Sequence, residues 1–279
     1  MQSASVVRMQ VRKYGSSERV VILVHGGPGA PGYLAPVARE LANSFRVLEL
    51  FQRRSGSEPL TVARHVTDLD DLIKSHGTER RPAIVGHSWG AMLALAYAAV
   101  HPDSVACLAL IGCGTFDTVA RNHMEATRNA RMDKSLRDQM KHFAREIPDS
   151  DERLRALGGL IRQVDSYDLI PAKDETEICD ARGHDETWRD MLRLQDEGVY
   201  PSCFVNIRSP VIMMHGAFDP HPGRLIRDGL ALQVPQLEYH EWEQCGHYPW
   251  LEKAVRDDFY STLQAWLRRN MTSGKFTPN

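Results

Sequence analysis

Short apolar runs that end in glycine or proline recur along this chain, and they constrain its fold more than any other feature. Val20–Val24 contains only valine, isoleucine and leucine, and a cluster rich in glycine and proline follows it. Such a run is typical of a strand that is buried on both faces of a sheet. Further strand-like runs at 46–51, 82–85 and 105–111 alternate with helix-forming segments at 35–42, 65–75 and 89–100. Strands that alternate with helices imply right-handed crossovers, so we predict the α/β fold class with a mainly parallel sheet flanked by helices.

The segment before this alternation has a different pattern. Apolar and polar residues roughly alternate from Val6 to Val11, which predicts a half-buried antiparallel strand. The sequence Tyr14–Ser17 contains glycine and two serines, and it is expected to form the turn that leads into the first buried strand.

A long polar stretch separates two parts of the α/β pattern. Residues 115–205 are mostly helix-forming, carry more acidic than basic residues, and contain no strong strand signal. The pattern resumes with strands expected at 209–215 and 237–242 and helices at 223–232 and 253–269. We therefore predict a core formed by residues 1–114 and 206–279, with residues 115–205 as a helical cap. The cap would emerge from the carboxyl end of a strand, where open α/β sheets place their ligand sites.

Charge and composition exclude several classes of partner. The chain has 34 Lys+Arg and 36 Asp+Glu, so its formal net charge of -2 provides no bulk attraction to nucleic acid or to an anionic membrane. Its first twenty residues are interrupted by charges, and no apolar run reaches the roughly 20 residues of a membrane span. We expect a cytoplasmic protein with neither a nucleic-acid nor a membrane partner; its oligomeric state is left open.

Cysteine and histidine spacing gives no sign of a metal centre. The 5 cysteines are an odd number without C-x-x-C spacing, which argues against a disulfide framework or a zinc site. The 12 histidines show neither H-x-x-x-H nor H-E-x-x-H spacing. No metal site is therefore expected.

The sequence Gly86-His87-Ser88-Trp89-Gly90 matches the pattern G-x-S-x-G. A strand is expected before it and a helix after it, which is the context that this motif requires. The sharp turn needs small residues at Gly86 and Gly90, since a side chain there would collide with adjacent backbone. Ser88 is therefore the candidate nucleophile.

A serine hydroxyl needs a base, and the base needs a group that orients it. Asp219 lies at the carboxyl end of one predicted strand, and His247 follows the next strand 28 residues later. The order Ser, Asp, His is the one that the motif predicts. We assign His247 as general base and then general acid, and Asp219 as the group that fixes the imidazole. A loop histidine that caps backbone, or an aspartate that favours a turn before Pro220, is the structural alternative.

Acyl transfer also needs two donors for the tetrahedral oxyanion. The backbone N–H of Trp89, directly after the candidate nucleophile, is one candidate. The glycine-rich loop after the first buried strand offers the other. Pro28 has no N–H, whereas Gly27 can adopt the unusual dihedral angles that aim its N–H inward. A phosphate-binding loop is excluded here because no Lys followed by Ser or Thr is present.

These motifs make the chain similar to serine hydrolases of the α/β-hydrolase fold, from the first hairpin to the last helix. Within that superfamily, His25–Gly29, Gln52–Gly56 and Ser88–Gly90 resemble the proline iminopeptidase branch. The resemblance implies a helical cap over the site, hydrolysis through an acyl-enzyme, and no metal or organic cofactor.

The chain also departs from that branch. The branch usually has glycine at the positions of His87 and Ala91 and aspartate near Phe51, and Trp188–Asp190 only loosely matches its amine-holding Trp-Glu element. An aminopeptidase must neutralise an α-ammonium with a carboxylate near the nucleophile. The candidates in the predicted cap are Asp185, Glu186, Asp190, Asp196 and Glu197. A solvated helix face explains such charges as well, and we favour that interpretation for each of them.

Three residues near the motifs have structural interpretations. His25 is expected to pack beneath the oxyanion loop. His87 either lines the pocket or orients a hydrogen bond beneath it. Cys245, two residues before His247, is expected to be a small buried residue and not a second nucleophile.

The sequence thus predicts a cofactor-independent serine hydrolase that acts on a small ester, an amide or the N-terminal bond of a short peptide. Carbon–carbon bond hydrolases and lactonases use the same three residues, so they remain alternatives within the fold. A ligand receptor without turnover is the alternative from another class. The complete set of triad and oxyanion residues argues against it.

Overall fold

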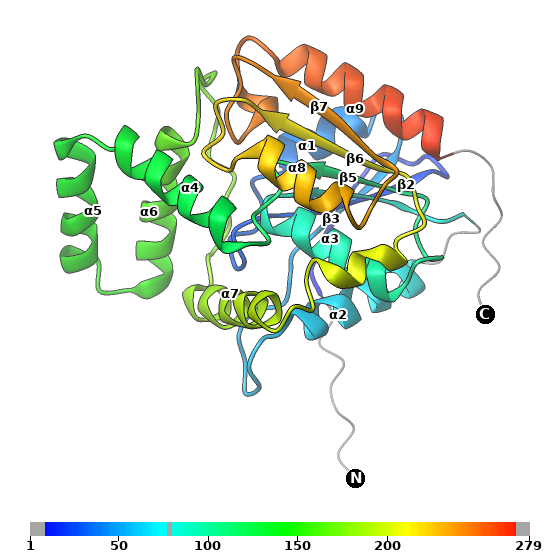
Figure 1. Ribbon diagram of the computed structural model, residues 1–279, viewed down its shortest axis with the longest axis horizontal. Coiled ribbons are helices and arrows are strands. Elements are labelled where there is room, and N and C mark those ends of the chain that lie inside the picture. The colour runs from blue at the N-terminus through cyan, green and yellow to red at the C-terminus, as the bar shows by residue number, and fades with distance from the viewer. Residues whose placement is uncertain (1–8, 77–79, 272–279) are drawn as a thin grey trace.

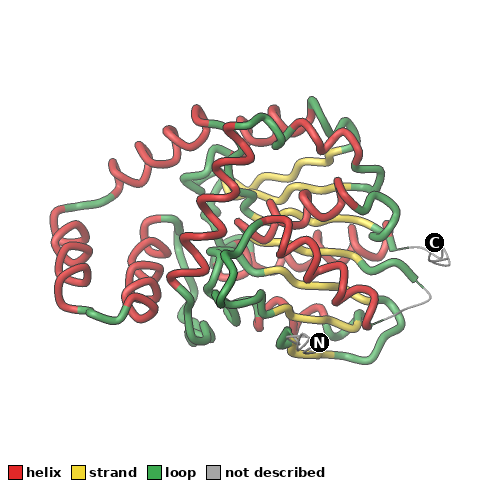
Figure 2. Tube along the Cα trace, turned by 90° about the horizontal axis from the view of Figure 1, so that it is seen from below, coloured by secondary structure: helices red, strands yellow, loops and turns green. Residues whose placement is uncertain are grey.

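A seven-stranded sheet forms the centre of this computed structural model, which describes residues 9–76 and 80–271. The strand order is β1-β3-β2-β4-β5-β6-β7, and only β1 runs antiparallel to its neighbour. Helices cover both faces of the sheet (Figures 1 and 2). The predicted α/β class with a mainly parallel sheet is confirmed.

The described elements follow each other in this order along the chain. The strands are β1 (Val11–Tyr14), β2 (Val20–Val24), β3 (Arg46–Leu50), β4 (Ala83–His87), β5 (Cys107–Ile111), β6 (Val211–Gly216) and β7 (Leu237–Trp242). The α-helices are α1 (Ala35–Leu41), α2 (Val62–Ser75), α3 (Trp89–Val100), α4 (Thr118–Arg131), α5 (Lys134–Glu146), α6 (Ser150–Val164), α7 (Ala181–Asp196), α8 (Gly223–Ala231) and α9 (Arg256–Asn270). Two short 3-10 helices, η1 (Ser202–Asn206) and η2 (Pro249–Leu251), complete the set.

The first strand lies later in the chain than its sequence pattern predicts. β1 is Val11–Tyr14, so Tyr14 belongs to a strand and not to the expected turn, and residues 6–8 of the predicted strand lie outside the described residues. The reason is the buried carboxylate of Glu49 on β3, which is 1% exposed. Arg12 pairs opposite Glu49 and forms an ion pair with it at 3.0 Å, and the Tyr14 hydroxyl donates to it at 2.9 Å. Satisfying this buried charge fixes the register.

Two apolar layers pack against the two faces of the sheet. In β2, Ile22 belongs to the layer beneath α2, α3 and α8, whereas Leu23 belongs to the layer beneath α1 and α9. Both side chains are 0% exposed. This explains why β2 is apolar at every position. The layers hold the strand ends, and therefore the loops that follow them, in fixed positions.

Helices α4 to α7 lie between β5 and β6 in sequence. In Figure 1 the first three of them lie beyond the end of the sheet to which the strand arrows point, and α7 lies beside α2. Carboxylates of α7 accept hydrogen bonds from the chain before and at the start of α2: Glu186 from Leu60 N–H at 2.9 Å and Asp190 from Val62 N–H at 2.8 Å. None of the helices in the described ranges is both long and apolar enough to cross a membrane.

The contact between α2 and α7 includes a buried histidine, His65, which predicts that the stability of the fold depends on pH. His65 is 3% exposed, bonds to Thr187 Oγ1 at 3.0 Å, and has its pKa lowered by burial to about 4. In the unfolded chain its pKa is about 6.5, so the unfolded state binds the proton first and stability falls as the pH decreases below that value. We predict that His65 contributes a loss of about 3 kcal/mol in the free energy of unfolding by pH 4. Denaturant titrations from pH 7 to pH 4 measure this loss.

The matched variant is His65→Gln, which keeps a polar side chain but cannot titrate. Its unfolding free energy should decline less steeply with falling pH than that of the unaltered protein. Equal slopes for the two proteins would contradict the assignment.

Candidate active site

Ser88 occupies a strained turn between β4 and α3. Its φ of 54° and ψ of -119° make it the only non-glycine residue with positive φ among the described residues. A Cβ added at Gly86 would collide with the Gly90 carbonyl oxygen, and one added at Gly90 would collide with the Val24 carbonyl oxygen. The two glycines therefore permit a conformation that costs backbone strain, which proteins concentrate at functional sites.

Asp219 and His247 form a short hydrogen bond at the carboxyl end of the sheet. Asp219 follows β6 and His247 follows β7, and Asp219 Oδ2 lies 2.6 Å from His247 Nδ1. Their exposed fractions are 6% and 3%. A carboxylate at Nδ1 favours the tautomer with the proton on that nitrogen, which leaves a lone pair on Nε2.

Ser88 and His247 line one cavity of about 440 Å³, together with Gly27 and Trp89. The side chains of Ser88 and His247 share no hydrogen bond in the described structure, although Asp219 and His247 do. Hydrogen bonds of this kind often tighten only when substrate binds. The structure thus joins two of the three predicted side chains directly and brings the third to the same cavity.

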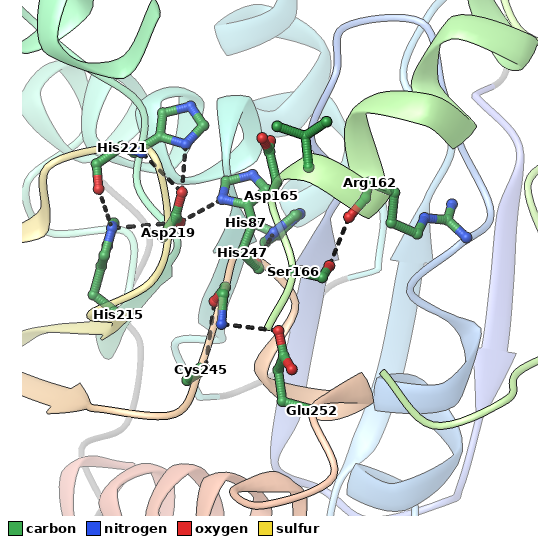
Figure 3. Close-up of polar contacts among 12 residues, drawn as sticks. His87, Arg162, Asp165, Ser166, His215, Asp219, His221, Cys245, His247 and Glu252 are labelled. Atoms are coloured by element: carbon green, nitrogen blue, oxygen red, sulfur yellow. Dashed lines mark hydrogen bonds and ion pairs between the residues drawn. The ribbon is translucent and has the colours of Figure 1, made fainter. Parts of the chain in front are cut away.

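Asp219 faces three imidazoles, as Figure 3 shows. His221 Nδ1 lies 2.8 Å from Oδ1, and His215 Nε2 lies 3.4 Å from Oδ2. Burial alone would raise the pKa of Asp219, but His247, His221 and His215 together hold it well below its ordinary value. The carboxylate is therefore ionised at neutral pH.

His221 was missed by the sequence reasoning. Its ring stacks on that of His247 with centroids 4.5 Å apart and an interplanar angle of 17°, and it lines the same cavity. Burial lowers its pKa, so it is neutral near pH 7. The signal was its position two residues after Asp219, where the turn folds its ring back onto the carboxylate.

The loop that carries His247 is fixed by buried acids. Glu252 is 0% exposed and accepts hydrogen bonds from the N–H groups of Gly246 at 2.8 Å, Tyr167 at 2.9 Å and Asp168 at 2.7 Å. The N–H of His247 itself donates to the Asp165 carbonyl oxygen at 2.8 Å. Figure 3 shows Glu252 and Asp165 beside this loop. These bonds tie the imidazole to the chain that follows α6.

His87 has both of the roles between which the sequence left a choice. It lines the cavity, and its Nδ1 and Nε2 lie 2.6 Å from the Tyr33 hydroxyl and 2.9 Å from the His247 carbonyl oxygen. Burial holds the pKa of His87 well below the ordinary value, so its ring is neutral. The neutral ring links the loop that carries Tyr33 to the loop that carries His247.

His25 is buried at the start of the glycine-rich loop that follows β2. It is 1% exposed, and its ring accepts the N–H of Gln52 at 3.3 Å. The Gln52 side chain in turn accepts the indole N–H of Trp89 at 2.8 Å. Cys245 is fully buried, burial raises the pKa of its thiol, and it is not among the residues that line the cavity.

The two candidate oxyanion donors lie on opposite sides of Ser88 in sequence and line the cavity with it. Gly27 has a φ of 45°, a conformation that favours glycine. Trp89 is the first residue of α3, so its N–H has no partner within the helix.

The acidic candidates of α7 do not reach this cavity. Asp185, Glu186, Asp190, Asp196 and Glu197 are absent from its lining. Glu186 and Asp190 accept hydrogen bonds from the chain before and at the start of α2, as described above. Asp185 pairs with Arg189, and Glu197, which directly follows α7, pairs with Arg193. The carboxylates that line the cavity are instead Glu125, Asp165 and Asp174. Sequence reasoning missed them because it could not place α4, α6 and the chain between α6 and α7 beside the cavity.

Asp219, His221 and His247 are also the one group in the described ranges whose ligand atoms lie close enough to hold a metal ion, within 4.8 Å of one another. Both carboxylate oxygens already accept short hydrogen bonds from the two imidazoles. A metal ion would have to displace those protons, so the arrangement fits a hydrogen-bonded cluster better than a metal centre.

Residues 21–257 match the alpha/beta hydrolase family. The chain belongs to this family. Among curated relatives, a proline iminopeptidase of Neisseria gonorrhoeae is 26% identical over 224 residues, which cover 74% of this chain and 66% of that protein. Esterase YbfF of Escherichia coli is 23% identical over 256 residues, which cover 88% of this chain and 93% of the relative. The predicted resemblance to hydrolases of this fold is therefore confirmed, and the protein is a hydrolase.

Solved structures of low identity share the fold of this alpha/beta hydrolase. The crystal structure of VinJ has a TM-score of 0.67 at 21% identity and covers 96% of this chain and 97% of its own. A thermophilic esterase from Thermogutta terrifontis has a TM-score of 0.64 at 19% identity, with 97% of both chains covered.

The strained turn of this alpha/beta hydrolase gives a direct stability prediction. Gly90→Ala should lower the free energy of unfolding by about 3 kcal/mol or more, because the new methyl group collides with backbone that cannot move away. Gly229→Ala in α8 is the matched control, since a Cβ there meets nothing within 4 Å. That change should leave stability unchanged or raise it by up to about 1 kcal/mol. Urea unfolding of both variants measures the difference, and equal effects would contradict the account.

Proposed function

We propose that this protein hydrolyses a small ester or amide through an acyl-enzyme formed on Ser88. The observation that carries the proposal is the buried Asp219–His247 hydrogen bond of 2.6 Å, whose imidazole lines the same cavity as Ser88. An ionised carboxylate at Nδ1 makes Nε2 the basic nitrogen of His247. Ser88 supplies a hydroxyl from a half-buried turn that lines the cavity, and no cofactor is required for this chemistry.

The proposed reaction has two halves. His247 accepts the Ser88 proton as the hydroxyl oxygen attacks the carbonyl carbon, and the resulting imidazolium is stabilised by Asp219. His247 then donates that proton to the leaving group, which departs as an alcohol or amine. In the second half a water molecule attacks the acyl carbon and gives a proton to His247. His247 then donates that proton to the Ser88 oxygen as the acyl–oxygen bond breaks, which releases the acid and restores Ser88.

The N–H groups of Gly27 and Trp89 are proposed to bind the oxyanion of both tetrahedral intermediates. Loss of one such donor typically lowers kcat by about 10²–10³. Tyr33 and Gln52 support this geometry, because the Gly26 N–H donates to the Tyr33 hydroxyl at 2.6 Å and the Gln52 amide donates to the His25 carbonyl oxygen at 2.8 Å. We propose that residues 115–205, with helices α4 to α7, form a cap over the site, and that residues 1–114 and 206–279 form the core.

Ester or simple amide hydrolysis is favoured over an aminopeptidase activity. Relatives named proline iminopeptidase support the peptidase reading. That reaction needs a free carboxylate in the cavity for the substrate ammonium. Of the three acids that line the cavity, Asp165 and Asp174 already pair with arginines. Glu125 is exposed, so water competes for its carboxylate and an ion pair with an ammonium there would be weak. The same three residues can also catalyse carbon–carbon bond hydrolysis and lactone opening. Assays with substrates of those two classes distinguish these activities from ester hydrolysis.

The nucleophile is tested by Ser88→Ala. We expect kcat on p-nitrophenyl esters to fall by about 10⁴ or more with an unchanged circular dichroism spectrum, because the attacking oxygen is removed. Ser261→Ala, at an exposed position of α9, is the control and should retain full activity. Turnover by Ser88→Ala close to that of the unaltered protein would remove the assignment.

The role of the carboxylate is tested by Asp219→Asn. The amide keeps the size of the side chain but removes its charge and disfavours the required histidine tautomer, so kcat/KM should fall by about 10³ or more. Asp228→Asn, at an exposed position paired with Arg227, is the matched control. Equal kinetics for the two variants would show that Asp219 does not act on His247.

A further inference from the structure

Some of the charged side chains that line the cavity have a partner of opposite charge within the described structure, and others do not. Besides Ser88 and His247, which we propose to be catalytic, the cavity lining contains four arginines and three carboxylates. They are Arg121, Arg128, Arg155 and Arg162 with Glu125, Asp165 and Asp174. An arginine keeps its charge at every accessible pH. Which of these cations already has an anionic partner therefore decides what charge a bound molecule meets.

The positive charge of Arg128 is already paired with the carboxylate of Asp165. Its guanidinium makes two parallel hydrogen bonds to Asp165, at 2.9 Å from Nε and 2.5 Å from Nη2. The Asp165 side chain is 1% exposed. A bidentate buried pair of this kind is closed to other partners, so neither residue is available to a substrate.

Arg155 and Arg162 share a single carboxylate. Asp174 lies 3.3 Å from Arg155 Nη2 and 3.8 Å from Arg162 Nη2. The Nε atom of Arg162 is buried and has no hydrogen-bond partner within the described ranges. Its guanidinium lies over the ring of Tyr248 at 5.5 Å, and Tyr248 is the neighbour of His247. Arg162 thus lies over the ring of the residue that follows His247, and one of its N–H donors has no partner in the described structure.

Arg121 has no anionic partner within ion-pair distance in the described structure. Its Nη2 donates to the Gln195 side-chain oxygen at 2.5 Å, and its Nε is buried without a hydrogen-bond partner. Gln195 in turn donates to the carbonyl oxygen of Thr115 at 3.1 Å, so it holds this arginine against the loop after β5. Glu125 lies one helical turn from Arg121 but is exposed and makes no ion pair with it.

We propose that this site selects substrates that carry a carboxylate, and that Arg121 and Arg162 bind it. The inference rests on the proposed hydrolase function and names the substrate class of the same site: the ester or amide of a dicarboxylic acid, or of another acid with a second anionic group. A neutral substrate would leave an unpaired guanidinium in the cavity, whereas a substrate carboxylate would pair with that guanidinium through charge-assisted hydrogen bonds. The same positive charge disfavours a substrate ammonium.

The test compares two p-nitrophenyl esters of similar length, the monoester of adipic acid and the ester of heptanoic acid. The unaltered protein should hydrolyse the adipate with a kcat/KM at least about 10-fold higher, because a carboxylate paired with arginine gives about 10- to 100-fold discrimination. Arg121→Gln and Arg162→Gln should each lower the ratio of the adipate kcat/KM to the heptanoate kcat/KM. Arg121→Lys, which keeps the charge, should restore part of this preference.

Arg189→Gln is the matched control, because Arg189 is exposed on α7 and does not line the cavity. Free adipate provides a second readout, since it should inhibit heptanoate hydrolysis by the unaltered protein and inhibit Arg121→Gln more weakly. Equal rates for both esters, or a preference that survives both glutamine variants, would overturn the proposal. Failure of the hydrolase assignment looks different, because neither ester would then show turnover that depends on Ser88.

Discussion

The buried negative charge of Asp219 is the constraint on which the site depends. A carboxylate removed from water is stable only when hydrogen bonds replace its hydration. Here His247 and His221 donate to its two oxygens at 2.6 and 2.8 Å, and the His221 backbone N–H adds a third bond at 2.9 Å. Satisfying this charge therefore sets the tautomer and orientation of His247. The proposed catalytic arrangement follows from electrostatics that the fold must satisfy in any case.

The sheet and the inserted helices make separate contributions to the cavity. Strand ends fix Ser88, Asp219 and His247, because β4, β6 and β7 are held by packing on both faces of the sheet. Helices α4 and α6 supply the arginines that line the other side of the cavity. The groups proposed for catalysis and those proposed to bind the substrate carboxylate therefore come from different parts of the chain.

Sequence patterns predicted the parts that depend on local order. The apolar run Val20–Val24 predicts a strand buried on both faces, because every side chain of such a strand lies away from water. The motif around Ser88 predicts a sharp turn, because a side chain at Gly86 or Gly90 would collide with backbone. What sequence could not reveal depends on distant contacts. The register of β1 depends on Glu49, and the charge balance of the cavity depends on which arginine meets Asp165 or Asp174. His221 combines local and distant information. Asp219, two residues before it, was recognised from the sequence, but the contact of the His221 ring with the Asp219 carboxylate was not.

The proposed acyl-enzyme on Ser88 is tested by rapid-quench mass spectrometry during turnover of a p-nitrophenyl ester. We expect a burst of one p-nitrophenolate per active site and an acyl group on the peptide that contains Ser88, with both greatly slowed in Asp219→Asn. An acyl group on another residue, turnover without any covalent adduct, or an undiminished burst in Asp219→Asn would contradict it.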